Sequence, residues 1–110
     1  MPNDELSAGR LLCADVLSEP VEPDGASAAL ATAAVTLSEG AVEIGLWEAG
    51  PGIDTDTEAD EVFLVLAGAG SVAFEGGSTI AVRPGVLVRL HAGDRTTWTV
   101  TERLRKLYLA

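Results

Sequence analysis

The stretch that decides the fold is Glu61-Val62-Phe63-Leu64-Val65-Leu66-Ala67-Gly68, an apolar run that begins with an acid and ends with a glycine. β-Branched and aromatic residues in such a run favour a buried strand, and a glycine can end it in a turn. Similar short runs, separated by turns that contain Gly or Pro, fill the rest of the second half of the chain. This spacing predicts an antiparallel sandwich, jelly roll or small closed barrel.

The turn residues divide the chain into short predicted strands. The Ala-rich residues 26–34 are ambiguous, and a short helix leading into a strand satisfies their helix and strand preferences together. Gly68-Ala69-Gly70 predicts a hairpin turn. We therefore expect one all-β domain, with residues 1–40 as an N-terminal tail plus an edge strand or short helix and residues 41–110 as the barrel core. The expected strands are 33–37, 41–48, 60–67, 70–75, 78–82, 86–90, 95–101 and 103–109.

Composition excludes several classes of function. Seventeen acidic residues against seven basic ones give a net charge of −10. Such a chain repels phosphate backbones and anionic lipid, so we expect neither nucleic acid nor membrane as a partner. No apolar run approaches the roughly 20 residues that cross a bilayer, and the N-terminal acids are unlike a secretory signal, which predicts a cytoplasmic protein. Cys13 is the only cysteine, which favours a buried bystander over a nucleophile.

Three groups of residues follow one another in a characteristic order along the second half of the chain. Trp47-Glu48 and Pro51-Gly52 precede the run 61–68, and Pro84-Gly85 and Ala92-Gly93 precede Trp98. The chain then closes with Trp98-x-Val100-x-Glu102-x-x-Arg105-Lys106-x-Tyr108. This order resembles the cupin superfamily, in particular its small single-domain branch with ethanolamine-utilisation cupins and ureidoglycine-aminohydrolase-like proteins. The resemblance implies an RmlC-like jelly-roll barrel, a double-stranded β-helix that encloses a pocket.

The metal site common in cupins, three histidines and a glutamate, cannot be built from this sequence. The one histidine, His91, falls in a predicted turn. Glu61 keeps the glutamate position, and the histidine of the second cupin motif falls on Thr96. The first motif's two histidines fall on Asp54 and Asp56, or on Thr55 and Thr57. We therefore expect no cofactor and no transition metal.

The acids around Glu61 leave two alternatives open. Asp54, Asp56 and Glu61, with neighbouring acids, could offer oxygen ligands to a hard divalent cation such as calcium or magnesium. The other interpretation is a solvated acidic loop, which we favour because the spacing does not match a calcium-binding loop and charge runs usually face water.

Strand alternation predicts the pocket. Successive side chains of a strand face opposite sides, so Glu61 shares a face with two apolar residues of its run, and Trp98 shares one with its neighbours two positions away. Trp47 falls on a mixed face and is expected to serve core or interface packing. Arg105 and Lys106 face opposite sides, so one can reach the pocket while the other is expected to be a surface charge near Glu102. The predicted lining is Glu61, Phe63, Val65, Thr96, Trp98 and Val100.

These residues support several functions. The first is a small-molecule-binding cupin that is metal-free, or that uses Glu61 as a general acid or base in an apolar cavity. The alternative is a hard-metal-dependent enzyme similar to ureidoglycine aminohydrolase, and a third is a barrel that serves only as a scaffold. The sequence leaves open whether the protein is an enzyme. We also expect a homodimer, with Leu11-Leu12-Cys13 as a candidate exchanged strand.

Overall fold

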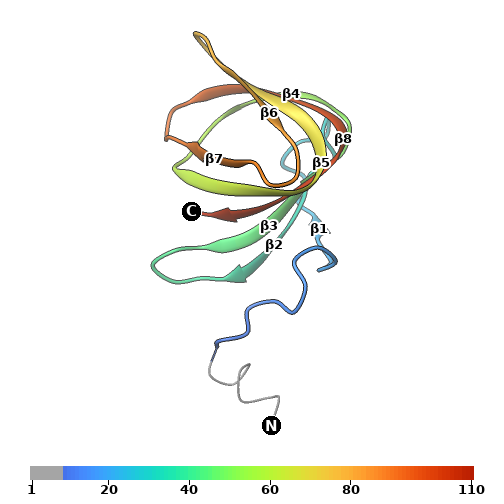
Figure 1. The fold of residues 1–110 in the computed structure, drawn as a ribbon, viewed down its shortest axis with the longest axis vertical. Helices are drawn as coiled ribbons and strands as arrows, with labels where there is room; N and C mark the ends of the chain where they lie inside the picture. The colour runs from blue at the N-terminus through green and yellow to red at the C-terminus, as the bar shows by residue number, and fades with distance from the viewer. Residues whose placement is uncertain (1–8) are drawn as a thin grey trace.

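All regular elements in the described part of the chain are β-strands. The computed structural model describes residues 9–110, and no helix in that range could cross a membrane. The all-β prediction is confirmed (Figure 1). The strands are β1 (Glu22–Pro23), β2 (Ala33–Ser38), β3 (Ile44–Ala49), β4 (Gly52–Thr57), β5 (Glu61–Phe74), β6 (Thr79–Val82), β7 (Leu87–Leu90) and β8 (Arg95–Leu109).

Two long strands organise the barrel. β5 and β8 pair antiparallel along most of their length, from Val62 opposite Leu109 to Phe74 opposite Thr96. The first half of β8 also pairs with β4 and its second half with β3, while β5 pairs with β7 and then with β6. Each long strand therefore contributes to two parts of the sheet, which curls around a common interior (Figure 1).

The hairpin turn predicted at Gly68-Ala69-Gly70 is wrong, since β5 continues through it. The β5–β8 register shifts in this region, as it does at β-bulges. Gly68 has a φ of +92°, and a Cβ on it would collide with the backbone of Arg103 on β8. These glycines therefore allow close approach of two strands and do not reverse the chain. The break predicted between 95–101 and 103–109 is also wrong, because β8 runs without interruption from Arg95 to Leu109.

The N-terminal third differs from the prediction in two places. Residues 26–34 form turns and the start of β2, and no helix. Residues 11–17, whose pattern fits an edge strand or a short helical turn, form no strand; the chain makes one turn there, in which the Glu19 N–H donates to the Asp15 carbonyl at 3.0 Å. β1 and β2 join the same sheet as the later strands. The tail predicted for residues 1–10 lies mostly outside the described residues.

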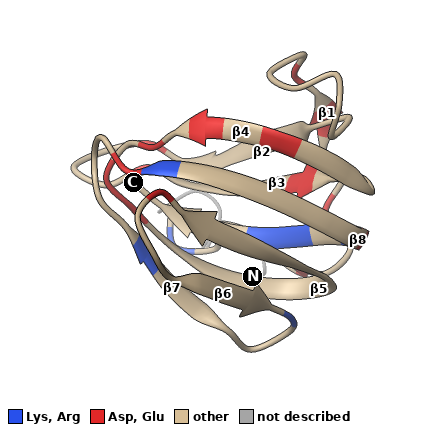
Figure 2. Cartoon of the chain, turned by 90° about the horizontal axis from the view of Figure 1, so that it is seen from above, with Lys and Arg blue, Asp and Glu red and all other residues tan. Residues whose placement is uncertain are grey.

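The acidic segment is also a strand. Residues 52–57, expected as a loop, form β4, with Asp54 opposite Trp98 and Asp56 opposite Thr96 on β8. Figure 2 shows acidic residues along β4 and on neighbouring β3. The barrel interior next to β4 is filled by an apolar cluster drawn from most of the strands and from the turn before β2. Its members are Leu30, Ala49, Phe63, Val65, Val72, Val82, Val88, Leu90, Trp98, Val100 and Leu104.

Candidate functional site

A cavity of about 340 Å³ lies beside this core, between β3, β4, β8 and the turns of residues 24–32. Its walls combine three aromatic side chains with several carboxylates and one ammonium group. Of the predicted lining, Glu61 and Trp98 border this cavity. Phe63, Val65 and Val100 are buried in the core, and Thr96 is buried and borders a separate hollow.

Lys106 occupies the inner wall of the cavity. Alternation along β8 turns it inward, opposite Trp47 of β3, and only 5% of the residue is exposed. Its Nζ donates to Glu61 Oε2 at 2.6 Å. The same Nζ lies 4.6 Å from the ring centroid of Trp47, 4.5 Å from that of Phe63 and 5.0 Å from that of Trp98. A carboxylate and three ring faces therefore replace the water that this ammonium has lost.

The two tryptophans form one aromatic wall. The ring centroids of Trp47 and Trp98 lie 5.3 Å apart with their planes tilted by 56°. Trp47 packs against the core, as expected, and it also lines the same cavity as Trp98. Glu58 Oε2 accepts hydrogen bonds from Trp98 Nε1 at 3.0 Å and from Thr96 Oγ1 at 2.6 Å. This carboxylate, one of the acids weighed above as a possible ligand of a hard cation, fixes the orientation of the indole instead.

The β4 acids differ in their surroundings. Asp54 accepts a hydrogen bond from Ser27 Oγ at 2.6 Å, which lowers the pKa of this carboxyl. Burial and then the charge of Glu58 raise the pKa of Asp56, against a smaller opposing effect of Lys106. The surroundings therefore favour the ionised form of Asp54 and disfavour that of Asp56.

Tyr108 completes the wall on the β3 side. Its hydroxyl donates to Glu43 Oε2 at 2.6 Å, and burial together with this contact raises its pKa to about 12. Gly45 lies directly opposite on β3, and a Cβ there would overlap the phenol ring. Tyr108 is therefore a neutral hydrogen-bonding group at neutral pH.

The donor set does not fit the metal site that the cupin resemblance implies. Within residues 9–110, no three His, Cys, Asp or Glu side chains come together in a way that could hold a metal ion. The weak candidates are engaged elsewhere, Asp54 with Ser27 and Glu61 with the Lys106 ammonium. His91 is exposed in the turn before β8. We therefore derive no chemistry through a metal.

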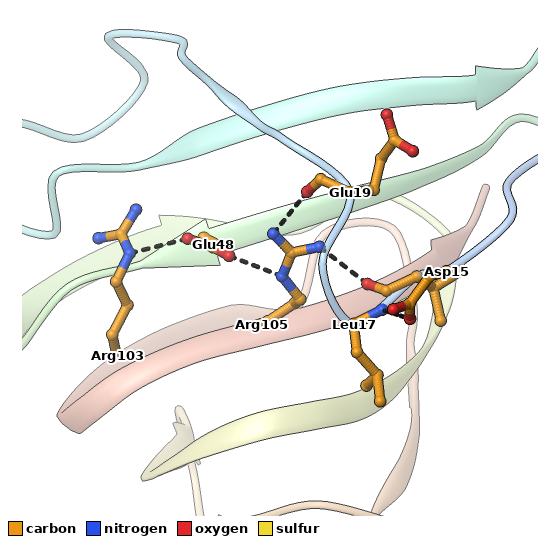
Figure 3. Close-up of polar contacts among 7 residues, drawn as sticks. Asp15, Leu17, Glu19, Glu48, Arg103 and Arg105 are labelled. Atoms are coloured by element: carbon orange, nitrogen blue, oxygen red, sulfur yellow. Dashed lines mark hydrogen bonds and ion pairs between the residues drawn. The ribbon is translucent and has the colours of Figure 1, made fainter.

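On the outer face of the sheet, the position of Arg105 differs from the prediction. Whichever of Arg105 and Lys106 did not reach the pocket was expected to be a surface charge near Glu102, but Arg105, which does not line the cavity, is 8% exposed and donates through Nε to Glu48 Oε2 at 2.6 Å. Its two terminal nitrogens donate to the carbonyls of Val16, at 2.8 Å, and Glu19, at 2.7 Å. Figure 3 shows the N-terminal segment passing over the guanidinium. Arg105 therefore holds this segment against the sheet.

A family model described as the EutQ-like cupin domain matches residues 36–108. The chain belongs to the EutQ-like cupin family. The predicted cupin jelly-roll fold is thereby confirmed, and no curated protein matches the chain in sequence.

Several solved structures of other proteins have a fold similar to that of this cupin. An ethanolamine utilization protein Q of Salmonella typhimurium LT2 is 21% identical, with 72% of this chain and 68% of that chain covered and a TM-score of 0.64. A Rhizobium leguminosarum protein of unknown function is 29% identical over 71% and 78% of the two chains, with a TM-score of 0.64. The polyketide cyclase RemF of Streptomyces resistomycificus is 20% identical over 89% and 77%, with a TM-score of 0.70.

Proposed function

We propose that this cupin binds a small organic molecule in the cavity that Trp47 and Trp98 line, with the Lys106–Glu61 pair as its fixed polar anchor. The observation that carries the proposal is the cavity itself. Its volume of about 340 Å³ is in the range of small-ligand sites, and such sites combine apolar walls with a few convergent polar groups. Neighbours with the same fold include an ectoine synthase and a polyketide cyclase, so the fold alone does not choose the chemistry.

Glu61 is the member of the Lys106–Glu61 pair that a ligand would contact. Its side chain is 19% exposed, against 6% for Lys106, so the carboxylate is the more accessible partner. General acid or base chemistry at Glu61 stays within the proposal, because its carboxylate borders the cavity in which the ligand would bind. The alternative of a hard-metal enzyme needs several oxygen ligands together, and residues 9–110 offer no such group.

The test is a fluorescence and thermal-shift screen of small metabolites on the intact protein. Because both tryptophans line the cavity, a ligand should alter the emission of Trp47 and Trp98 together, and Trp98→Phe alone should reduce the signal without removing it. Glu61→Gln should weaken binding while the protein remains folded, and Glu102→Gln, which removes a charge outside the cavity, should not.

Two results contradict the proposal. One is a ligand that binds Glu61→Gln as tightly as the wild type. The other is a ligand that binds the double variant Trp47→Phe, Trp98→Phe with unchanged affinity and leaves the emission of Tyr108, which lines the same cavity, unchanged. Either result moves the binding site out of this cavity.

A further inference from the structure

We propose that the molecule bound in this cavity is a small organic cation, an alkylammonium or trimethylammonium compound seated between the Trp47–Trp98 wall and the acids of β4. This inference rests on the proposed function and adds the ligand class to it. It is carried by the charges and by the aromatic faces that line one cavity.

The charges of the side chains that line the cavity favour a cationic ligand. The one positive group, Lys106, is already matched by Glu61 at 2.6 Å. Four further acids border the cavity and have hydrogen-bond donors but no cationic partner in the described residues, although they do not converge closely enough to hold a metal ion: Asp24, Asp54, Asp56 and Glu58. Charges held around a cavity with low-dielectric walls act more strongly than in water, and the chain as a whole carries −10. An anionic ligand would therefore be repelled, whereas a cation would gain four nearby carboxylates.

The aromatic wall supplies the second element of a cation site. The structure already shows an ammonium, that of Lys106, within 5.0 Å of the centroids of Trp47 and Trp98. Both rings also border the cavity, where a ligand can contact them. The hydrogen bond from Trp98 Nε1 to Glu58 places a negative charge at the edge of the indole and so favours a cation on its face.

The β4 acids support the same ligand class. Burial and the neighbouring charge of Glu58 raise the pKa of Asp56, so its ionised form is disfavoured relative to a free carboxylate. A cation beside Asp56 would relieve this repulsion, because an opposite charge favours the carboxylate. Substitution of Asp56 should therefore weaken the binding of a cationic ligand more than the binding of an uncharged ligand of the same shape.

The experiment compares three ligands of similar shape and different charge. Choline, its neutral isostere 3,3-dimethylbutan-1-ol and the anion 3,3-dimethylbutanoate are titrated into the full chain at pH 7.5 and constant ionic strength, with calorimetry as the readout. Choline should bind at least about tenfold more tightly than the alcohol. The carboxylate should show no saturable binding. Added salt should weaken choline binding and leave the alcohol unchanged.

Two variants locate the charge effect. Asp56→Asn should bring the affinity for choline closer to that for the alcohol, and Glu102→Gln, which changes the net charge equally outside the cavity, should keep the wild-type ratio. Equal affinities for choline and alcohol, or a preference for the carboxylate, overturn the ligand class and leave the proposed function standing. Choline failing to bind at low millimolar concentration overturns the ligand class as well. The proposed function falls with it only if the metabolite screen also yields no ligand.

Discussion

Lys106 places an ammonium in a barrel interior that is otherwise largely apolar. Taking a charge out of water costs several kcal/mol, and only a close partner offsets this cost. Here Glu61 and three aromatic rings provide the compensation. A well-packed apolar pair would stabilise the fold about as well, so we infer that the contribution of the ion pair lies in the charges that it holds at the cavity wall.

The pair predicts a specific pattern in a double-mutant cycle. Lys106→Met leaves the Glu61 carboxylate without its partner and should lower the free energy of unfolding by about 2–4 kcal/mol. Glu61→Gln should cost less, because an amide oxygen can still accept from the ammonium. The double variant should recover much of the loss, which chemical denaturation can measure. Strictly additive effects of the two substitutions would show that the two side chains are not coupled.

Two glycines test the interpretation of β5. Gly68→Ala combines a positive φ with a clash against the backbone of Arg103, so it should lower the free energy of unfolding by about 3 kcal/mol or more. Gly76→Ala is the matched control, since Gly76 also has a positive φ but has open space around it, and it should cost about 1 kcal/mol. Equal losses for the two variants would argue against close approach as the role of Gly68.

The strand elements show where sequence patterns suffice and where they do not. Alternation along the last strand predicted that only one of Arg105 and Lys106 could reach the pocket, and the backbone bears that out. A glycine in a bulge has the same local signal as a glycine in a turn, so the continuity of β5 through Gly68 was not predictable. The acids of β4 suggested a loop, because pairing with Trp98 and its neighbours is a long-range effect that no local pattern contains.

The contact of the N-terminal segment with β8 predicts a pH effect. Burial would raise the pKa of Glu48, but its hydrogen bonds to Arg103 and Arg105 outweigh this and hold it below its ordinary value of 4.5. Glu48 therefore contributes stability above about pH 4.5, and this contribution is lost as the pH falls through the lowered folded-state pKa. Glu48→Gln should give a flatter dependence of unfolding free energy on pH below 4.5. A parallel pH profile for the variant and the wild type would contradict this.

The same contact predicts a local loosening. Arg105→Met should free the segment of residues 15–19 from the sheet, because the two carbonyls of Val16 and Glu19 lose their donors. Limited proteolysis should then cleave this segment faster in the variant, while cleavage of the barrel itself changes little. Arg103→Met is the control, since Arg103 also pairs with Glu48 but contacts neither carbonyl.

At the scale of the whole molecule, the barrel leaves large apolar side chains in water. The exposed ones include Leu11, Leu12 and Leu17 before β1, with Ile53 on β4 and Leu87 on β7. Residues 11 and 12 form no strand within the chain, although they lie next to the segment that Arg105 holds against the sheet. Exposed apolar groups that lie together on one segment are typical of a surface that a partner covers.

We therefore expect a homodimer in which the segment around Leu11 and Leu12 packs on the second copy, since closed two-fold dimers are the commonest assembly. Sedimentation equilibrium at micromolar concentration should give about twice the monomer mass of 11.3 kDa. The double variant Leu11→Ser, Leu12→Ser should shift the equilibrium toward monomer, because it removes apolar area from the interface without touching the barrel core. Leu87→Ser, which replaces an equally apolar and more exposed side chain on β7, should leave the mass unchanged. Dissociation caused by Leu87→Ser instead would place the interface on β7, and a monomer in the wild type would show that the segment has no partner in a second copy.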